Sequence, residues 1–284
     1  MLLQRVITAL VLLAILLPAL FYPSVTPFAL VVLVFMAAGA WEWGRLNGCG
    51  NAAALGLSAV CLVLCAGSWW GGWLDRPLPL LWTLGGGLWV ACAAWLLRAG
   101  VPGWPLIPAP VRIVLGVLAL WLAWLAVVQA RILGINFLLS VLTLVWVADI
   151  FAYFAGRAFG LRFTRNKLAP SISPGKSWEG VWGGLAGVLC LAVAWVAADR
   201  YFQADVASFY TRLYSAGWWF LAIAVVFMVA MSVAGDLVES LIKRSAGVKD
   251  SSGLLPGHGG VLDRVDALLP TLPLALMLTR LISV

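Results

Sequence analysis

The chain has 284 residues, of which 64% are apolar and only 10% are charged, and its mean hydropathy is +1.04. Because soluble globular proteins carry about 25% charged residues, this composition excludes a soluble enzyme, a disordered chain and a secreted disulfide scaffold. An all-α integral membrane protein is predicted instead. The net charge of +7 is interpreted as a guide to membrane topology, not as a nucleic-acid-binding signal. The five cysteines have no paired spacing, which predicts packing residues and no zinc site or disulfide.

Nine apolar stretches are long enough to cross a bilayer, whose hydrocarbon core takes about 20 helical residues. The first of them follows Arg5 but lacks a small-x-small cleavage site, so it is interpreted as a span and not as a signal peptide. The predicted spans are residues 6–21, 28–43, 52–73, 80–97, 113–130, 137–155, 181–198, 218–234 and 267–282.

The lysines and arginines are distributed unevenly between the two sides of this arrangement. With the N-terminus inside the cell, thirteen of them fall on the cytoplasmic side and five on the other. Since cytoplasmic loops are enriched in Lys and Arg, this orientation is predicted and the reverse one is disfavoured. The five on the outer side are Arg76, Arg131, Arg200, Arg212 and Arg280.

Acidic residues are concentrated in the second half of the chain. Up to Leu144 there are only two, Glu42 and Asp75, and no lysine. Two long cytoplasmic loops and the helix ends that lead into them contain most of the others together with all four lysines. Because ionisable groups near a bilayer are costly, this concentration indicates a functional site. Seven acids belong to it: Asp149, Glu179, Asp236, Glu239, Asp250, Asp263 and Asp266.

The eighth span continues the helical period past its apolar part. Asp236, Glu239, Ser240 and Lys243 are spaced i, i+3, i+4 and i+7, which predicts one stripe on a single helix face. An ordinary solvated stripe with a Glu239–Lys243 ion pair is the competing interpretation. Asp236 fits that interpretation poorly, because it lies closest to the apolar segment and is costly to desolvate without a partner.

A glycine-rich segment follows, Pro256-Gly-His-Gly-Gly-Val-Leu-Asp-Arg-Val-Asp266. Its glycines allow the backbone to approach a ligand and to turn N–H groups towards an anion. Asp263 and Asp266 are predicted to open the last helix. Their carboxylates and that of Asp236 are hard oxygen ligands suited to Mg²⁺, which keeps its other positions for water and substrate phosphate.

The other polar loop contains Gly175-Lys176-Ser177, which has the end of a Walker A motif. The first glycine of that motif would fall on Pro170, and a helical membrane protein offers no strand–loop–helix context. Walker A is therefore rejected. Lys176 remains a candidate phosphate contact.

The spacing Ser240-Leu-Ile-Lys-Arg244, Lys249-Asp250 and then 256–266 resembles the signature of the phosphatidate cytidylyltransferases (CDP-diacylglycerol synthases). Asp149-x-x-Ala-Tyr-x-x-Gly-Arg157 and residues 173–180 resemble the family's second conserved block. The resemblance covers the C-terminal half. One departure is Gly175, where the family commonly has lysine, so an additional phosphate contact is not expected there.

The resemblance implies transfer of CMP from CTP to phosphatidic acid, giving CDP-diacylglycerol and pyrophosphate with Mg²⁺. It leaves open whether K⁺ or a second Mg²⁺ accompanies that ion. It divides the chain into an N-terminal multi-span hydrophobic region, 1–135, and a C-terminal catalytic membrane region, 136–284. The expected setting is a bacterial inner membrane with the active site facing the cytoplasm and membrane lipid as a partner. No nucleic acid is expected, and a homodimer is a candidate assembly.

The predicted site is defined by the helix stripe, by the two polar loops and by the family resemblance. Its catalytic residues are Asp236, Lys243, Lys249, Asp250, His258, Asp263 and Asp266. The predicted substrate-binding residues are Lys176, Ser240, Arg244, Gly257, Gly259, Gly260 and Arg264. The predicted metal ligands are Asp236, Asp263 and Ser240.

Two other functions fit parts of the pattern. A multi-span anion transporter would share the spans and the cationic excess, but carrier sites lie near the bilayer midplane on broken helices. A related CTP-dependent transferase acting on another lipid would keep the chemistry and change the acceptor. His258, the only histidine, is expected to hold the glycine loop or a phosphate and not to act as general base, since the attacking phosphate is already ionised near pH 7.

Overall fold

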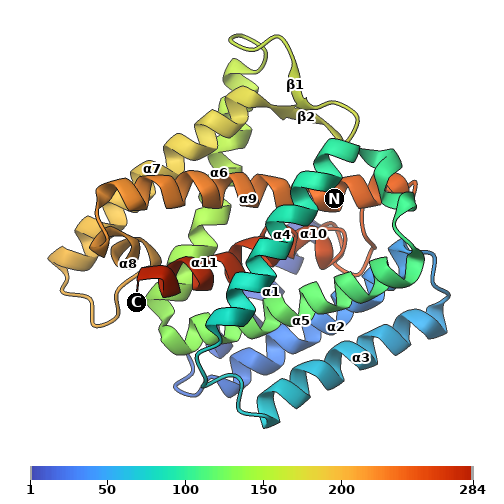
Figure 1. The fold of residues 1–284 in the computed structure, drawn as a ribbon, viewed down its shortest axis with the longest axis horizontal. Helices are drawn as coiled ribbons and strands as arrows, with labels where there is room; N and C mark the ends of the chain where they lie inside the picture. The colour runs from blue at the N-terminus through green and yellow to red at the C-terminus, as the bar shows by residue number, and fades with distance from the viewer. Residues whose placement is uncertain (1, 283–284) are drawn as a thin grey trace.

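The computed structural model describes residues 2–282 and is built from helices with one small hairpin (Figure 1). Within these residues nine helices are long and apolar enough to cross a membrane, which confirms the nine predicted spans. Most of them extend beyond the predicted ends. The long helices are α1 (Leu2–Phe21), α2 (Thr26–Leu46), α3 (Asn51–Trp70), α4 (Pro79–Ala99), α5 (Ala109–Leu133), α6 (Ile135–Phe159), α7 (Trp178–Tyr201), α9 (Trp218–Ser245) and α11 (Leu268–Ile282).

Three short elements connect them. These are a 3₁₀ helix, η1 (Val101–Leu106), and the helices α8 (Phe209–Ser215) and α10 (Leu262–Val265). Several boundaries have a local cause. Ser177 caps α7 by accepting a hydrogen bond from the Gly180 N–H at 3.2 Å. Gly134, with φ of +139°, is the single residue between α5 and α6, a conformation that side chains disfavour.

Helix α9 is the central element of the fold. In its most apolar window 61% of the residues are buried inside the protein, against 11% for α1. Figure 1 shows α9 crossing the middle of the molecule, where it packs against α4, α7, α8 and α11. Helix α5 packs against α2, α3 and α11 in a second group. Residues on α9 are therefore held from several sides.

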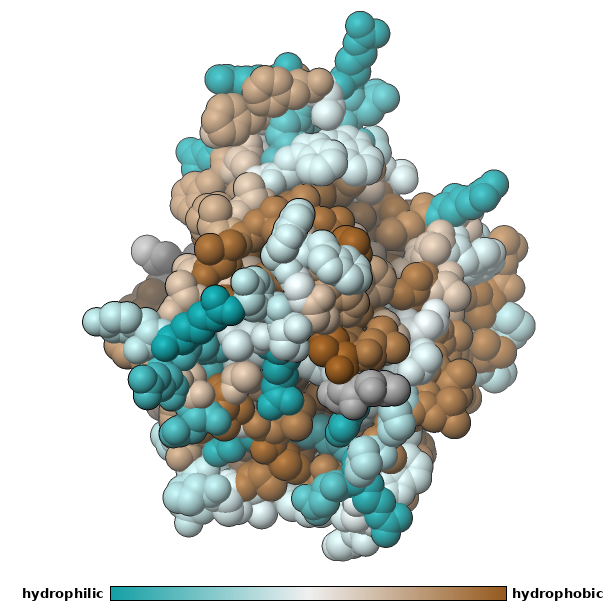
Figure 2. Space-filling model, turned by 60° about the vertical axis from the view of Figure 1, so that its left-hand side comes forward, coloured by the Kyte–Doolittle hydropathy of each residue, from teal (hydrophilic) through white to brown (hydrophobic). Residues whose placement is uncertain are grey.

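The outer faces of the helices are apolar. Figure 2 shows broad apolar areas on one face, with hydrophilic side chains projecting at the top, at the left and right sides and at the bottom. Large side chains such as Leu3, Val34 and Val63 are about two-thirds exposed or more. In water such a surface would be unstable, so it fits helices whose outer faces contact lipid. Cys61 and Cys65 are buried in α3, as predicted for packing residues, whereas Cys190 on α7 is exposed, so the prediction is wrong for that cysteine.

Two local features go beyond the sequence prediction. The polar loop after α6 forms an antiparallel hairpin of β1 (Lys167–Ala169) and β2 (Ser173–Ser177), which projects beyond α6 and α7 (Figure 1). Asp263 lies in the short helix α10, which a turn at Asp266 and Ala267 separates from α11, although Asp266 keeps α-helical backbone angles (φ −48°, ψ −51°). The prediction that Asp263 and Asp266 open the last helix is confirmed, because Leu262–Ile282 forms one candidate span with this turn inside it. The predicted continuation of the eighth span through Lys243 is confirmed, because α9 ends at Ser245.

Candidate active site

A first polar cluster joins the hairpin to the end of α9. The Lys176 ammonium group on β2 contacts Asp236 Oδ2 at 2.5 Å, and the Ser240 hydroxyl donates to Asp236 Oδ1 at 3.3 Å. Asp236 and Ser240 are one helical turn apart, as the predicted stripe requires. The Lys176 and Asp236 side chains are 27% and 29% exposed. The cluster is therefore accessible to a ligand from outside.

Two more acids surround this cluster. Asp149 on α6 and Asp266 between α10 and α11 each interact electrostatically with Asp236 and with each other. Lys176 offsets part of this negative charge through its attraction to Asp149 and its contact with Asp236. The three carboxylates therefore repel one another when they are ionised, and a cation near them would reduce that repulsion.

A second cluster lies one turn further along α9 and is more deeply buried. Lys243 contacts Glu239 Oε2 at 2.5 Å and Asp263 Oδ1 at 2.6 Å. The side chains of Lys243, Glu239 and Asp263 are 13%, 8% and 5% exposed. Breaking so buried an ion pair leaves an uncompensated charge and is strongly destabilising. The interpretation of the stripe as solvated is therefore wrong for Glu239, because this side chain is buried together with Lys243.

The other oxygen of Asp263 holds the segment that joins α9 to α10. Asp263 Oδ2 accepts hydrogen bonds from the Ser251 N–H at 2.9 Å, the Ser251 hydroxyl at 3.0 Å and the Gly260 N–H at 2.7 Å. A carboxylate that accepts several such bonds fixes both ends of a loop. Asp263 thus connects the glycine loop, here residues 251–262, to Lys243.

Three of the four glycines of this loop are required by contacts within the protein, whereas Gly253 has open space around it. A Cβ on Gly257 would lie 2.9 Å from Arg5 Cγ, and one on Gly259 would lie 2.6 Å from Asp263 Oδ2. Both residues also have positive φ, +76° and +83°, which favours glycine. A Cβ on Gly260 would lie 2.4 Å from Glu42 Oε1. The loop was predicted to turn N–H groups towards an anion. The Gly260 N–H donates instead to the side chain of Asp263, so contact of these glycines with a ligand stays a prediction.

Other predicted residues hold the loops or lie at the surface. Arg244 Nε donates to the Ile172 carbonyl at 3.3 Å, and Arg264 Nη2 donates to the His258 carbonyl at 2.7 Å. Lys249 and Asp250 are exposed after α9, and Asp250 lies close to Gly259. His258 is half-buried, and its backbone N–H donates to the Leu255 carbonyl at 2.8 Å.

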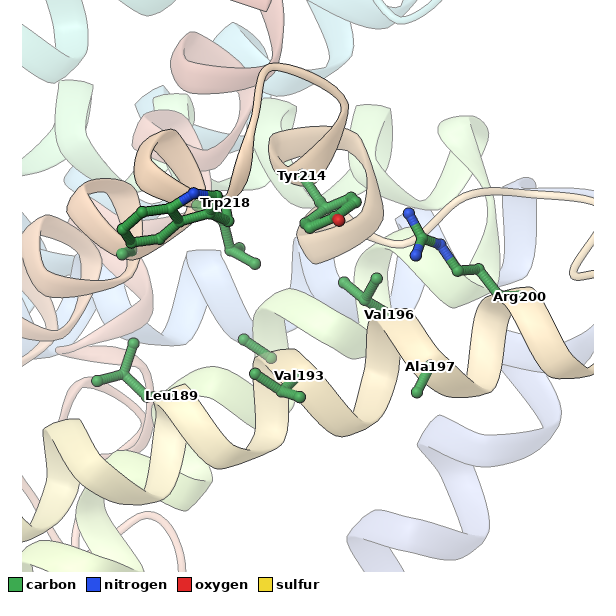
Figure 3. A pocket seen from close by; sticks show the side chains of 10 residues that line it. Leu189, Val193, Val196, Ala197, Arg200, Tyr214 and Trp218 are labelled. Atoms are coloured by element: carbon green, nitrogen blue, oxygen red, sulfur yellow. The ribbon is translucent and has the colours of Figure 1, made fainter.

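A cavity of about 370 Å³ lies far from both clusters, between α7, α8 and the start of α9 (Figure 3). Aliphatic side chains such as Leu189, Val193 and Val196 line it, and Arg200 lies at one end. Its α9 residues, Trp218 to Ala222, precede Asp236 by at least 14 positions, or about 20 Å at 1.5 Å per residue. Among the described residues that line it there is no carboxylate. The polar clusters, not this cavity, form the candidate active site.

Comparison with known proteins identifies the family of the chain. The sequence model of the Cytidylyltransferase family matches residues 3–282. The chain belongs to the cytidylyltransferase family. It is 40% identical to a phosphatidate cytidylyltransferase of Pseudomonas aeruginosa over 96% of this chain and 95% of that protein.

Two further relatives carry the same name and match over shorter stretches. The phosphatidate cytidylyltransferase of Haemophilus influenzae is 51% identical over 140 residues, which cover 49% of this chain and 44% of that protein. The one of Thermotoga maritima is 40% identical over 146 residues, 51% of this chain and 49% of that protein. The resemblance of the sequence to the cytidylyltransferases is thereby confirmed.

Sequence reasoning missed some residues of this cytidylyltransferase that contact or surround the site. Glu42 on α2 binds the glycine loop, and Arg5 and Thr8 on α1 donate to the Gly257 and Pro256 carbonyls at 2.9 and 2.8 Å. Asp149 was counted among the acids but was given no role. The sequence did contain an indication that Glu42 has a role, since it is one of only two acids in the first half of the chain. Its partners, however, lie more than 200 positions away.

Proposed function

We propose that this protein transfers CMP from CTP to phosphatidic acid, giving CDP-diacylglycerol and pyrophosphate. The observation that carries the proposal is the convergence of Lys176, Asp236, Lys243 and Asp263, from three separate elements, at one end of the helical bundle of a cytidylyltransferase. The names of the relatives support phosphatidic acid as the acceptor. Membership of this family also favours transfer over anion transport.

The proposed reaction is a displacement at the α-phosphorus of CTP. An oxygen of the phosphatidate monoester forms the new P–O bond, the bond from the α-phosphorus to the bridging oxygen breaks, and pyrophosphate leaves with the bond electrons. The attacking monoester has its second pKa near 6, so it needs little help from a base. What remains to be supplied is positioning and neutralisation of two anions.

Lysines and arginines of the site would supply that neutralisation. Lys176 contacts Asp236, and Lys243 contacts both Glu239 and Asp263, so each would bind a phosphate oxygen by exchanging a carboxylate contact for it. Lys249 and Arg264 are exposed beside the loop and would bind phosphate groups that arrive from water. Arg244 would combine phosphate binding with its contact to the hairpin. Because charge at the reacting phosphates is redistributed in the transition state, such contacts lower the barrier when they strengthen there.

Mg²⁺ is the proposed cofactor, and the donor set fits it. Asp236 Oδ1 has a single weak contact from Ser240, and Asp149 and Asp266 repel Asp236. Of Asp263, Oδ2 already accepts three hydrogen bonds and Oδ1 contacts Lys243 at 2.6 Å, so Asp263 would join the metal through Oδ1 only by exchanging its contact with Lys243. Within residues 2–282 no three acids, histidines or cysteines are arranged as a ready metal cluster. Mg²⁺ commonly takes only one or two carboxylates, so Asp236 with Ser240 and Asp263 would hold it.

When bound, Mg²⁺ would polarise the phosphate oxygens of CTP and neutralise charge on the departing pyrophosphate. The contribution of the chain is to keep Asp236 accessible and to keep Lys176 beside it. A K⁺ ion next to Mg²⁺ and a homodimer are further parts of this proposal.

The direct test is incorporation of label from CTP into lipid by the purified protein. We expect CDP-diacylglycerol to form from phosphatidic acid and CTP, to need Mg²⁺ and to stop when EDTA removes it. Diacylglycerol and other lipid phosphates as acceptors separate this activity from a related transferase. Uptake of CTP into sealed vesicles without labelled lipid would instead identify a carrier.

The active site is proposed to face the cytoplasm of a bacterium, at the inner membrane. We expect a cysteine at position 254, where Leu254 is 46% exposed in the glycine loop, to react only with reagent supplied from inside. Asp205→Cys, on the exposed connection after α7, is the matched position at the other end of the bundle. Both are placed in a background without the five native cysteines. Labelling of position 254 from outside would show that the orientation in the membrane is the reverse of the proposed one.

Replacement of His258 should reduce activity without changing the reaction's pH dependence. Its backbone closes the loop, and this contact survives substitution. His258→Asn keeps a hydrogen-bond donor, so at most one hydrogen bond is weakened. We therefore expect turnover to fall about tenfold or less. The measurement is the pH–rate profile of both proteins with the same lipid. If the acidic limb of that profile disappears in His258→Asn, the histidine is the general base after all.

A further inference from the structure

Glu42 is a buried carboxylate that reaches the candidate site from the N-terminal half of the chain. It lies on α2, one helical turn before that helix ends at Leu46, and it is fully buried. None of the ion pairs within residues 2–282 includes it. A buried carboxylate without a cation is stable only if its oxygens are well hydrogen-bonded.

The glycine loop provides those hydrogen bonds. Glu42 Oε1 accepts from the Ser252 hydroxyl at 2.5 Å and from the Val261 N–H at 2.9 Å. Oε2 accepts from the Leu262 N–H at 2.8 Å and lies 3.2 Å from the Ser251 hydroxyl, whose single proton it shares with Asp263 Oδ2. Each oxygen therefore has one fixed backbone donor and one hydroxyl beside it. Glu42 joins the two ends of the loop, at 251–252 and 261–262.

These contacts continue into the catalytic clusters. Ser251 lies between Glu42 and Asp263, with its hydroxyl 3.2 Å from one carboxylate and 3.0 Å from the other. Asp263 in turn contacts Lys243. Gly260 packs so closely on Glu42 that a Cβ would lie 2.4 Å from Oε1. The position of Asp263 relative to α9 therefore depends on a side chain of α2.

We propose that Glu42 is a positioning residue for cytidylyl transfer, which holds Ser251 and the start of α10 so that Asp263 faces Lys243. The inference rests on the proposed function. Glu42 acts through the loop, because its four contacts are all with protein groups and none of its oxygens is left for substrate. The N-terminal region is then part of the working site and not only a membrane anchor.

An amide cannot replace this carboxylate. In Glu42→Gln one of the two oxygens becomes an NH₂ group, and in either orientation it faces a backbone N–H, of Val261 or of Leu262. The NH₂ group of the glutamine and that backbone N–H are both donors, so they cannot form a hydrogen bond with each other in this buried position. The 261–262 end of the loop is then released. Asp75→Asn is the matched control, because Asp75 is the other acid of the first half and is exposed on the opposite side.

The test combines steady-state kinetics with hydrogen exchange in detergent. For Glu42→Gln we expect kcat to fall about 10- to 100-fold, the effect of lost hydrogen bonds to a charged group, with a much smaller change in KM for CTP. Peptides covering 250–266 should exchange faster, while those of α5, α6 and α7 stay as protected as in wild type. Asp75→Asn should match wild type in both measurements. Wild-type kcat with unchanged exchange in Glu42→Gln would overturn the proposal.

Two milder variants cover the case in which Glu42→Gln fails to fold. Ser252→Ala removes one contact to Glu42, and Ser251→Ala removes contacts to both Glu42 and Asp263. We expect kcat to fall more in Ser251→Ala than in Ser252→Ala, with local loss of protection in each. Equal, wild-type kinetics in both would contradict the proposal. An inactive wild-type protein would instead refute the proposed function, while the exchange measurement would still report whether Glu42 holds the loop.

Discussion

Asp263→Asn is expected to abolish cytidylyl transfer and also to lower the stability of the protein. The asparagine has one oxygen, whereas Asp263 uses one for Lys243 and the other for three donors of Ser251 and Gly260. Its NH₂ group must therefore oppose either the Lys243 ammonium or the loop donors. Loss of one partner of a buried ion pair costs about 3–5 kcal/mol, so the thermal unfolding midpoint in detergent should fall.

Activity and stability of Asp263→Asn are measured together. We expect turnover to fall by at least about 100-fold, and additional Mg²⁺ not to restore it, because the loop itself is displaced. Asp205→Asn, which changes an exposed acid at the other end of the bundle, should leave both quantities unchanged. An Asp263→Asn protein with wild-type turnover would remove Asp263 from the site.

Asp236→Asn should give the same loss of activity with little loss of stability. Asp236 is 29% exposed, and its contact with Lys176 is a partly solvated pair, worth about 1 kcal/mol or less. The thermal unfolding midpoint should therefore stay close to that of wild type. Turnover should nevertheless collapse, because the carboxylate that faces Ser240 and Lys176 is the proposed Mg²⁺ ligand.

The contrast between these two variants separates a metal ligand from a structural acid. The Mg²⁺ concentration needed for half-maximal activity should rise in any Asp236 variant that retains turnover, such as Asp236→Glu. If Asp236→Asn keeps wild-type turnover and Mg²⁺ dependence, the ligand assignment is wrong and Asp236 serves only to hold Lys176.

Much of the fold could be predicted from local sequence properties. A span needs about 20 consecutive apolar residues, and this requirement can be checked along the chain without knowing any neighbour. The stripe from Asp236 to Lys243 was predictable for the same reason, because the helical period alone brings these residues onto one face. The predicted pair of Glu239 and Lys243 forms accordingly.

The tertiary structure alone decided which side chains meet across the chain. Glu42 and Leu262 are 220 positions apart, and Lys176 and Asp236 are 60 apart. No periodicity links such residues, because their contact depends on how α2, the hairpin and α9 pack. The same packing gives Gly257, Gly259 and Gly260 their neighbours, Arg5, Asp263 and Glu42. The sequence by itself determined the spans and the residue types of the site, whereas helix packing determined their partners, since a local pattern carries no information about distant neighbours.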